Sequence, residues 1–522
     1  MIGVKLILLS SLVFMGVGSC SPSYSSSSST IHTHQYGPYQ HDEHGHWRVC
    51  LDESCGYLEE KAAHQFVRAD QDYQVTFICS ICGYSYSMGE MLKYEYLPEE
   101  DGYAVSKGIY FDTQIEELTI PSTHAGKPVI EVGSFGGLEQ LKKVTIPEGV
   151  LRLGDACFQR CPKLEALEIP DSVESIGAYF CEGDTALASL KLSSQLWRIP
   201  ELAFNGTAIS SVTLGKEVRE IERHAFSFCP NLTTIEVSSE NPYYTTQDGV
   251  LFSKDMTELA VYPTGREGAY EIPDTVTSLG ITAFEGAMAL TSVKLSAIPS
   301  LAERSFFRCE NLTSVTIPEG VVNIGTDAFY GCYSLPSVVF PSTLESIGNW
   351  AFMHCTSLTS IRLPKACVSL GLYPFNDMTA LTKFEVASGN PVFEASQGVL
   401  YGHQDGHHAL LMAPRSFQGL LRIPAGIEYI DNFSLTNTPG LTGMIVPTGF
   451  KAFYDSLQGC DRFSAVYYEG TAKDWANIEY SEGTGLPLNI SVVYYYSKTK
   501  PTNVPDSSLY WRYVDGLPTN WN

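Results

Sequence analysis

The chain has little positive charge and few charged residues of any kind. Its 522 residues include 33 Lys and Arg against 58 Asp and Glu, which gives a formal net charge of −25. This balance favours solubility and repels phosphate backbones, so nucleic acid is not an expected partner. Only 17% of the residues are charged while 44% are hydrophobic, so the chain has ample apolar surface for a folded core.

The sequence also lacks an apolar run that could span a bilayer, and it lacks familiar catalytic motifs. The apolar stretch within residues 1–19 is too short to span comfortably and is typical of a secretory signal. No GxSxG elbow, GxxxxGK[ST] loop, HExxH or strand followed by GxGxxG occurs. The sequence therefore predicts a binding protein and not an enzyme.

The residues around Cys20 indicate a lipid anchor. Val17, Gly18 and Ser19 precede Cys20, and together they resemble the bacterial lipobox. The resemblance implies a signal peptide over residues 1–19, diacylglycerol on Cys20, and export to a surface-exposed place on the bacterial cell envelope. The lipid would be the only contact with the membrane. An ordinary signal peptide with a chance cysteine is the alternative. A Ser/His-rich tether is expected over residues 20–45 because such a segment has little to bury.

Two cysteine pairs, each followed by Gly-Tyr, lie within residues 46–90. Zinc takes four soft or borderline ligands in a tetrahedron, and a cysteine pair on a tight turn supplies two of them. We expect a structural zinc site formed by Cys50, Cys55, Cys79 and Cys82, with His46 and His64 as alternates for either member of the first pair. Two disulfides are the alternative, since an exported protein permits them. The pattern resembles small zinc-ribbon-like modules.

A leading leucine or isoleucine recurs along most of the chain, in two series with steps of 22 or 23 residues. The first series is Leu141, Leu164, Leu187, Ile209 and Leu232, and the second is Leu290, Leu312, Leu335, Leu358 and Leu381. This period lies in the range of leucine-rich repeats. One such unit cannot enclose its own apolar residues, so successive coils must stack and share a core.

Residues 311–332 show the unit clearly. Alternation predicts a short strand in which Val315 and Ile317 face inward, and Pro318 ends it because proline has no amide hydrogen. A second extended run ends at Gly325, and Phe329 then enters the coil.

The motif A-F-x-x-C at residues 225–229, 328–332 and 351–355 resembles the BspA-like leucine-rich repeats of bacterial surface proteins. The resemblance implies a mainly β, right-handed repeat solenoid with repeats of about 23 residues. The expected parts are an N-terminal cap and first repeat over 91–140, repeats over 141–450, and a C-terminal cap over 451–522. Hairpin inserts projecting from one edge are expected near 238–263 and 388–414. The repeat cysteines should form a buried ladder: Cys161, Cys229, Cys309, Cys332 and Cys355.

The residues between and before the inward Val and Ile should point outward and form a polar sheet face. The expected binding surface on this face is Lys143, Thr145, Glu168, Lys191, Glu236, Lys294, Arg362 and Glu385. The resemblance implies adhesion to proteins of a host or of neighbouring cells. One alternative is glycan capture by aromatic residues of the inserts, namely Tyr243, Tyr244, Phe252, Phe393 and Tyr401. The other is an envelope spacer without a specific ligand.

Overall fold

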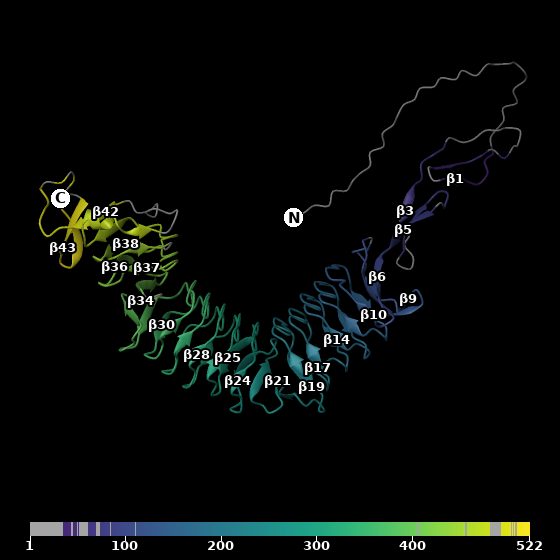
Figure 1. The fold of residues 1–522 in the computed structure, drawn as a ribbon, viewed down its shortest axis with the longest axis horizontal. Helices are drawn as coiled ribbons and strands as arrows, with labels where there is room; N and C mark the ends of the chain where they lie inside the picture. The colour runs from purple at the N-terminus through teal and green to yellow at the C-terminus, as the bar shows by residue number, and fades with distance from the viewer. Residues whose placement is uncertain are drawn as a thin grey trace, which may run out of the picture. The chain divides into compact units, whose positions relative to one another are not determined.

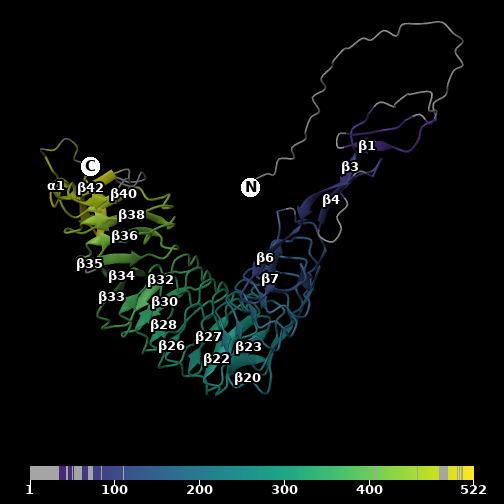
Figure 2. The same ribbon diagram turned by 45° about the vertical axis from the view of Figure 1, so that its right-hand side comes forward.

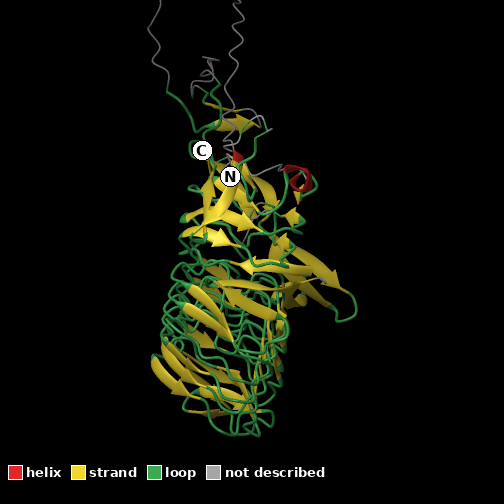
Figure 3. Cartoon of the chain, turned by 90° about the vertical axis from the view of Figure 1, so that its left-hand side faces the viewer, coloured by secondary structure: helices red, strands yellow, loops and turns green. Residues whose placement is uncertain are grey.

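The chain divides into two compact units, Met1–Gly89 and Glu90–Asn522. The computed structural model describes residues 35–42, 45–49, 51, 61–68, 74–83, 85–109, 111–404, 407–454, 457–480, 492–502, 504, 506 and 509–521. Strands and turns dominate, and the α-helix in this described part is the short segment α1 (Ala472–Trp475) (Figure 3).

The described residues of the N-terminal unit form five short strands. In order they are β1 (Gln40–Asp42), β2 (Gly45–Trp47), β3 (Phe66–Arg68), β4 (Gln74–Cys79) and β5 (Ser85–Glu90). β1 and β2 form an antiparallel pair that aligns His41 with His46, and β3, β4 and β5 form a second sheet. β3 runs antiparallel to β4, so the start of β3 lies beside Cys79 at the end of β4.

The second unit is a β-solenoid of about 16 coils with repeats of roughly 23 residues, as the spacing of leucines predicts. Figure 1 shows the coils following one another in chain order. Most first strands pair in parallel with the first strand of a neighbouring coil, as in the alignment of Thr213 with Glu236. These first strands are β8 (Glu117–Thr119), β11 (Lys143–Thr145), β13 (Ala166–Glu168), β15 (Ser189–Lys191), β17 (Ser211–Leu214), β19 (Thr234–Val237), β23 (Gly268–Glu271), β25 (Leu290–Lys294), β27 (Ser314–Thr316), β30 (Ser360–Leu363), β32 (Lys383–Val386), β36 (Gly419–Arg422), β38 (Leu441–Val446), β40 (Ala465–Tyr468), β42 (Val492–Tyr496) and β43 (Tyr510–Val514).

A second ladder of parallel strands runs along another side of the coils. In the repeat unit, its strand comes after the proline that ends the first strand. Its members are mostly two residues long because a tight turn follows each of them: β10 (Lys127–Val132), β12 (Arg152–Leu153), β14 (Ser175–Ile176), β16 (Arg198–Ile199), β18 (Glu220–Ile221), β24 (Ser278–Leu279), β26 (Ser300–Leu301), β28 (Asn323–Ile324), β29 (Ser346–Ile347), β31 (Ser369–Leu370), β37 (Tyr429–Ile430), β39 (Ala452–Phe453) and β41 (Glu479–Tyr480). Gly325 follows β28, and a Cβ atom there would lie 2.8 Å from backbone atoms of the preceding coil. The glycine therefore lets two coils approach closely.

Stacked phenylalanines run through the core of the solenoid. Phe329 lies between Phe306 and Phe352 of the neighbouring coils, with ring centroids 5.2 and 5.0 Å away. All three side chains are fully buried, and Phe226 is also buried and stacks on Phe204. Phe329 therefore enters the core, as the sequence predicts, and the other phenylalanines of the A-F motif are buried as well.

The two inserts differ from the expected projecting hairpins. The hairpins themselves are present, β20 (Tyr244–Gln247) with β21 (Val250–Ser253) and β33 (Phe393–Ser396) with β34 (Val399–Gln404). Asp248 and Gly249 both have positive φ, as a two-residue hairpin turn requires. Each hairpin, however, leads into a third strand, β22 (Glu258–Val261) or β35 (His407–Met412), which joins the second ladder. The inserts are therefore built into the solenoid wall, as the position of β20 and β22 among the coils in Figure 2 also shows.

Antiparallel strands cover both ends of the solenoid. β6 (Leu92–Leu97) pairs with β7 (Gly102–Lys107) at the start, where the short strand β9 (Thr123–His124) also pairs with β10. At the other end, β43 pairs with β44 (Leu517–Asn520). Parallel pairing continues through β38, β40 and β42, well past residue 450, where the sequence predicted the closing cap to begin. Trp511 is fully buried in this region and donates from Nε1 to the carbonyl of Tyr468, at 3.1 Å.

Candidate functional site

The predicted binding residues lie on the outward side of the first-strand ladder. We call this surface the sheet face, defined by the eight residues Lys143, Thr145, Glu168, Lys191, Glu236, Lys294, Arg362 and Glu385. Seven of them are exposed and Glu385 is half-buried. The inward partners of the row, such as Val144, Leu167 and Val212, are buried. The alternation of the strand therefore sorts the side chains as the sequence predicts.

Most charges on the sheet face are paired with a neighbour. Lys191 forms an ion pair with Glu168, and Lys294 forms one with Glu271 of the preceding strand. Lys383 and Glu385 form another at 2.5 Å, within one strand. Because parallel pairing aligns equivalent positions, unlike charges in adjacent coils lie opposite each other. The sheet face is thus polar but has little net charge along much of its length.

One coil lacks a first strand and so interrupts the row of outward side chains. Residues 337–340 form no strand, and Val339 is 79% exposed. Pro336 and Pro341 flank this segment, and neither can donate an amide hydrogen to a ladder. The sheet face is therefore interrupted between β27 and β30.

A hollow of about 470 Å³ opens on the sheet face where β15 meets β17. Lys191 and Lys216 supply positive charge, and Ser211 and Thr213 supply hydroxyl groups. Ser194 and Ser238 add two more hydroxyls. The lining is thus rich in hydrogen-bond donors, in contrast with the net negative charge of the chain.

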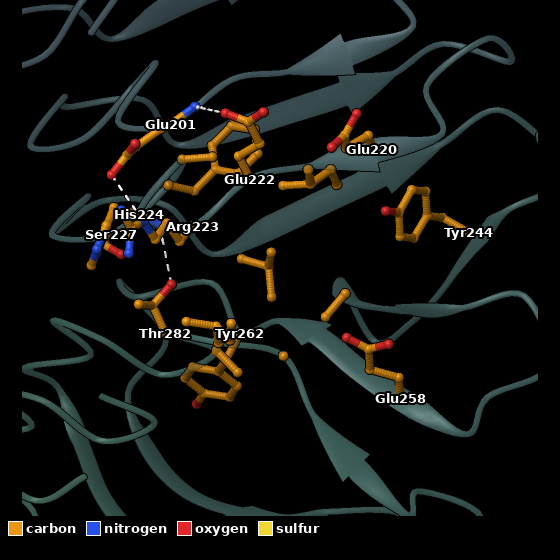
Figure 4. Close-up of a pocket in the computed structure, with 18 of the residues that line it drawn as sticks. Glu201, Glu220, Glu222, Arg223, His224, Ser227, Tyr244, Glu258, Tyr262 and Thr282 are labelled. Atoms are coloured by element: carbon orange, nitrogen blue, oxygen red, sulfur yellow. Dashed lines mark hydrogen bonds and ion pairs between the residues drawn. The ribbon is translucent and has the colours of Figure 1, made fainter. Parts of the chain in front are cut away.

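A second pocket, of about 560 Å³, lies where the first insert joins the coils (Figure 4). Four carboxylates line it: Glu201, Glu220, Glu222 and Glu258. Arg223 donates from Nε to Glu201 at 3.0 Å, and Glu222 accepts from the backbone amide of Glu201 at 2.8 Å. Burial and then the nearby carboxylate of Glu258 raise the pKa of Tyr244, which lines the same opening. The pocket is acidic and suits a cationic group.

His224 lies beside this pocket in a buried polar network. Its imidazole contacts the carboxylate of Glu285, which is 1% exposed and also binds the guanidinium of Arg304. The backbone amide of His224 donates to Thr282 at 3.1 Å. These bonds join coils on either side of the first insert, so His224 packs at the edge of its coil.

His354 is half-buried and lies 3.6 Å from the carboxylate of Asp377. Burial, followed by the charge of Arg415, lowers the pKa of His354. This second repeat histidine also packs at the edge of its coil.

The aromatic residues of the inserts do not form the contact surface that glycan capture would need. Phe252, Phe393 and Tyr401 are buried, at most 6% exposed. Phe252 and Phe393 belong to one buried core cluster of the solenoid, and Tyr401 belongs to the cluster of the C-terminal coils. Tyr243 is 47% exposed and Tyr244 is half-buried. The five residues therefore do not share one exposed surface.

The repeat cysteines are fully buried, as predicted for a ladder of small residues. Each thiol of Cys309, Cys332 and Cys355 donates to the carbonyl of a core phenylalanine in the preceding coil, at 3.1 to 3.3 Å. Burial raises the pKa of Cys229 to about 11. These thiols hold adjacent coils together and are not available for chemistry at the surface.

In one coil the ladder position is taken by a carboxylate, Asp184. Its Oδ1 accepts from the backbone amide of Cys161 at 2.6 Å, and its other oxygen is buried without a partner. Burial raises the pKa of Asp184 to about 8.

In the N-terminal unit the structure brings His46, His64, Cys79 and Cys82 together, with their ligand atoms within 4.8 Å of one another. This cluster contains both alternates of the predicted zinc site and one of its two cysteine pairs. Burial opposes ionisation of Cys79, but bonds from the backbone of Cys82 and Ile81 and from His64 outweigh it and lower the pKa of the thiol to about 5. Cys50 and Cys55 lie outside the described residues.

The predicted signal peptide and Cys20 also lie outside the described residues. Within the part that the structure describes, no helix is long and apolar enough to cross a membrane.

Residues 104–233 and 268–382 match the family model described as "BspA type Leucine rich repeat region", in six copies. The two matched segments are thus similar to BspA-type leucine-rich repeats. The gap between them contains the first insert, and the second match ends before the second insert. The resemblance seen in the A-F-x-x-C motif is thus supported for the repeats.

Several solved structures are similar to parts of the chain. The pneumococcal vaccine antigen PcpA is 18% identical, with a TM-score of 0.45, and the match covers 80% of this chain and 97% of that one. A leucine-rich repeat protein from Bacteroides ovatus is 19% identical, with a TM-score of 0.43 and coverage of 75% and 98%. A leucine-rich cell surface protein from Faecalibacterium prausnitzii is 19% identical, with a TM-score of 0.36 and coverage of 79% and 97%. No curated protein matches the sequence.

Proposed function

We propose that this chain is a non-catalytic binding protein of the bacterial surface, and that it attaches to proteins of a host or of neighbouring cells. The observation that carries the proposal is the hollow around Lys191 and Lys216, since it is a concave, donor-rich site on the face that the repeat leaves open to solvent. The BspA-type repeats support the same role.

The chemistry of the hollow favours a protein partner that presents acceptors. Lysine ammonium groups and serine and threonine hydroxyls bind carboxylates and backbone carbonyls of an extended segment through many weak polar contacts. Lys191 of the hollow pairs with Glu168, and Lys216 lies 3.9 Å from Glu217, so the hollow offers hydrogen-bond donors and polarity more than long-range attraction. Elsewhere on the sheet face, Lys294 is paired with Glu271.

The test is a charge reversal in the hollow. We expect Lys191→Glu with Lys216→Glu to weaken attachment to those host or matrix proteins that the unaltered chain binds, measured on a protein panel beside a glycan array. Lys473→Glu with Lys498→Glu is the matched control, because both lysines are exposed and lie near the C-terminal end of the chain. The control variant should bind as the unaltered chain does.

Each other result has a definite meaning. If the hollow variant binds every protein unchanged, the sheet face is not the contact surface. Binding to the glycan array alone would favour glycan capture instead, and no binding on either panel would favour an envelope spacer.

We also propose that Cys20 carries the lipid that holds the protein on the envelope. The residues before it carry this proposal. Cys20→Ala should release the protein from the membrane fraction of the native host, as followed by fractionation and immunoblotting. If this variant stays in the membrane fraction, the anchor assignment is wrong.

A further inference from the structure

Four side chains that bind transition metals converge in the N-terminal unit. Nδ1 of His46 lies 3.8 Å from Sγ of Cys79, and Nδ1 of His64 lies 3.4 Å from Sγ of Cys82. All four ligand atoms lie within 4.8 Å of one another. His46 belongs to β2, Cys79 ends β4, and the other two residues lie in the segments that flank β3 and β4. Strand β2, the segment before β3 and the turn at the end of β4 thus bring the four ligands to a common centre.

The local backbone explains this convergence. Antiparallel pairing of β3 with β4 places Phe66 opposite Cys79, which brings His64, two residues earlier, to the end of β4. The amide of Gly83 donates to the carbonyl of Cys79 at 2.9 Å and closes a tight turn around Cys82. Gly83 has a φ of +75°, a conformation that glycine adopts without strain.

His46 is brought to the centre by a different contact. Its backbone exchanges two hydrogen bonds with Ala62, at 2.8 and 2.9 Å. A Cβ atom at the adjacent Gly45 would lie 2.3 Å from the carbonyl oxygen of Ala62, so only glycine permits this approach.

Two sulfur–nitrogen separations in the cluster are close to those of a tetrahedral zinc site. With Zn–S bonds of about 2.3 Å and Zn–N bonds of about 2.0 Å, tetrahedral geometry places a sulfur and a nitrogen ligand about 3.5 Å apart. The two measured sulfur–nitrogen distances, 3.8 and 3.4 Å, lie on either side of that value. A set of two thiolates and two imidazoles is also a frequent ligand set of structural zinc.

A second interaction prepares one of the imidazoles for a metal. Nε2 of His64 lies 2.6 Å from the backbone carbonyl of Asp42, which can only accept, so Nε2 carries the proton. The lone pair of Nδ1 then faces Cys82. Asp42 is held in turn by Lys61, at 2.6 Å, and by the amide of Gly45, at 3.2 Å. Such partners commonly orient metal-binding histidines.

We propose that His46, His64, Cys79 and Cys82 bind one zinc ion, which holds the N-terminal unit together. Four protein ligands fill the tetrahedron, so the ion has no open position for a substrate and its role is structural. This assignment replaces the cysteine pair Cys50 and Cys55 of the sequence prediction with the two histidines. It is independent of the adhesion proposed for the solenoid.

The experiment compares two double variants of the full chain. Purified protein is analysed for zinc by mass spectrometry, and the site is loaded with Co²⁺ to read its ligands from the absorption spectrum. We expect one zinc per chain in the unaltered protein and in Cys50→Ser with Cys55→Ser. We expect none in His46→Ala with His64→Ala. The cobalt spectrum should show tetrahedral d–d bands and the sulfur-to-metal charge transfer of two thiolates.

A ligand exchange keeps the test valid if the histidine variant fails to fold. His64→Cys retains a ligand and should retain zinc, with stronger charge transfer because a third thiolate is present. His41→Ala, which changes a histidine on the neighbouring strand outside the cluster, should leave the zinc content unchanged.

Three outcomes would overturn the proposal. The first is zinc at background in the unaltered chain, and the second is zinc that survives His46→Ala with His64→Ala. The third is loss of zinc in Cys50→Ser with Cys55→Ser, which would return the site to the four cysteines.

Discussion

Each of the two units of the chain is stabilised internally in a different way. In the solenoid most coils repeat the same buried leucine and phenylalanine positions, so a coil away from the ends shares its core with neighbours on both sides. Among the described residues of the N-terminal unit, apart from glycine, only His46 and Cys79 are at least nine-tenths buried. The comparison teaches that a repeated core spreads its stability over many equivalent contacts, whereas a small unit concentrates it in a few.

The largest expected effect follows from metal removal. If zinc holds the N-terminal unit, a strong chelator should unfold that unit and leave the solenoid intact, because apparent binding energies of structural zinc are on the order of 10 kcal/mol. Limited proteolysis should then cut within residues 61–83 only after chelation, while the thermal transition of the solenoid stays unchanged. Equal resistance to protease before and after chelation would contradict this prediction.

A single cavity in the solenoid should have a smaller but clear effect. Phe329→Ala removes a fully buried ring from the centre of the stack and should cost roughly 3 to 5 kcal/mol of unfolding free energy. Phe433→Ala is the matched control, since Phe433 is 42% exposed and should cost much less. Urea titration followed by circular dichroism measures both. Similar losses of unfolding free energy for the two variants would show that the stacked rings contribute no more to stability than a partly exposed phenylalanine does.

A third, pH-dependent effect should come from Asp184. Its pKa in the folded chain is about 8, raised from 3.8 mainly by burial, so between these values the unfolded chain releases a proton that the folded chain keeps. Stability contributed by the protonated carboxyl is therefore lost as the pH rises from about 4 to about 8.

Asp184→Cys restores the ladder residue and should remove this loss. The variant should gain up to a few kcal/mol over the unaltered chain at pH 8.5 and much less at pH 5. Thr207→Cys, at the same position of the next coil, should show no such pH dependence. The urea midpoints at both pH values give the comparison, and a gain independent of pH would argue against a buried carboxyl as its source.

The same contrast between units explains how far the sequence could be interpreted. Leu312, Val315 and Phe329 have equivalents in many coils, so each inward position is predicted by several independent examples, and the sorting of the sheet face follows from strand alternation. The inserts occur only twice, and no pattern in them indicates that a third strand returns to the second ladder or that Phe252 is buried. The N-terminal unit occurs once.

What the sequence could not provide is contact between residues far apart in the chain. His64 reaches Cys82 only because β3 pairs with β4, and spacing alone favoured the cysteines at 50 and 55. The acidic pocket likewise joins Glu220 to Glu258 across an insert. Lys216 lies two residues after the end of β17 and three residues after Thr213, and this place near the outward row is a signal that sequence reasoning could have used.

The ladder of buried thiols also allows the local opening of individual coils to be measured. A buried thiol with a raised pKa reacts with an alkylating reagent only when its coil opens, and burial raises the pKa of Cys161, Cys229 and Cys309. Because these cysteines lie in different coils, the labelling rate of each measures the local opening of its own coil. The labelling rates of the native cysteines therefore report the order in which the coils open along the solenoid. No further residue has to be introduced for this measurement.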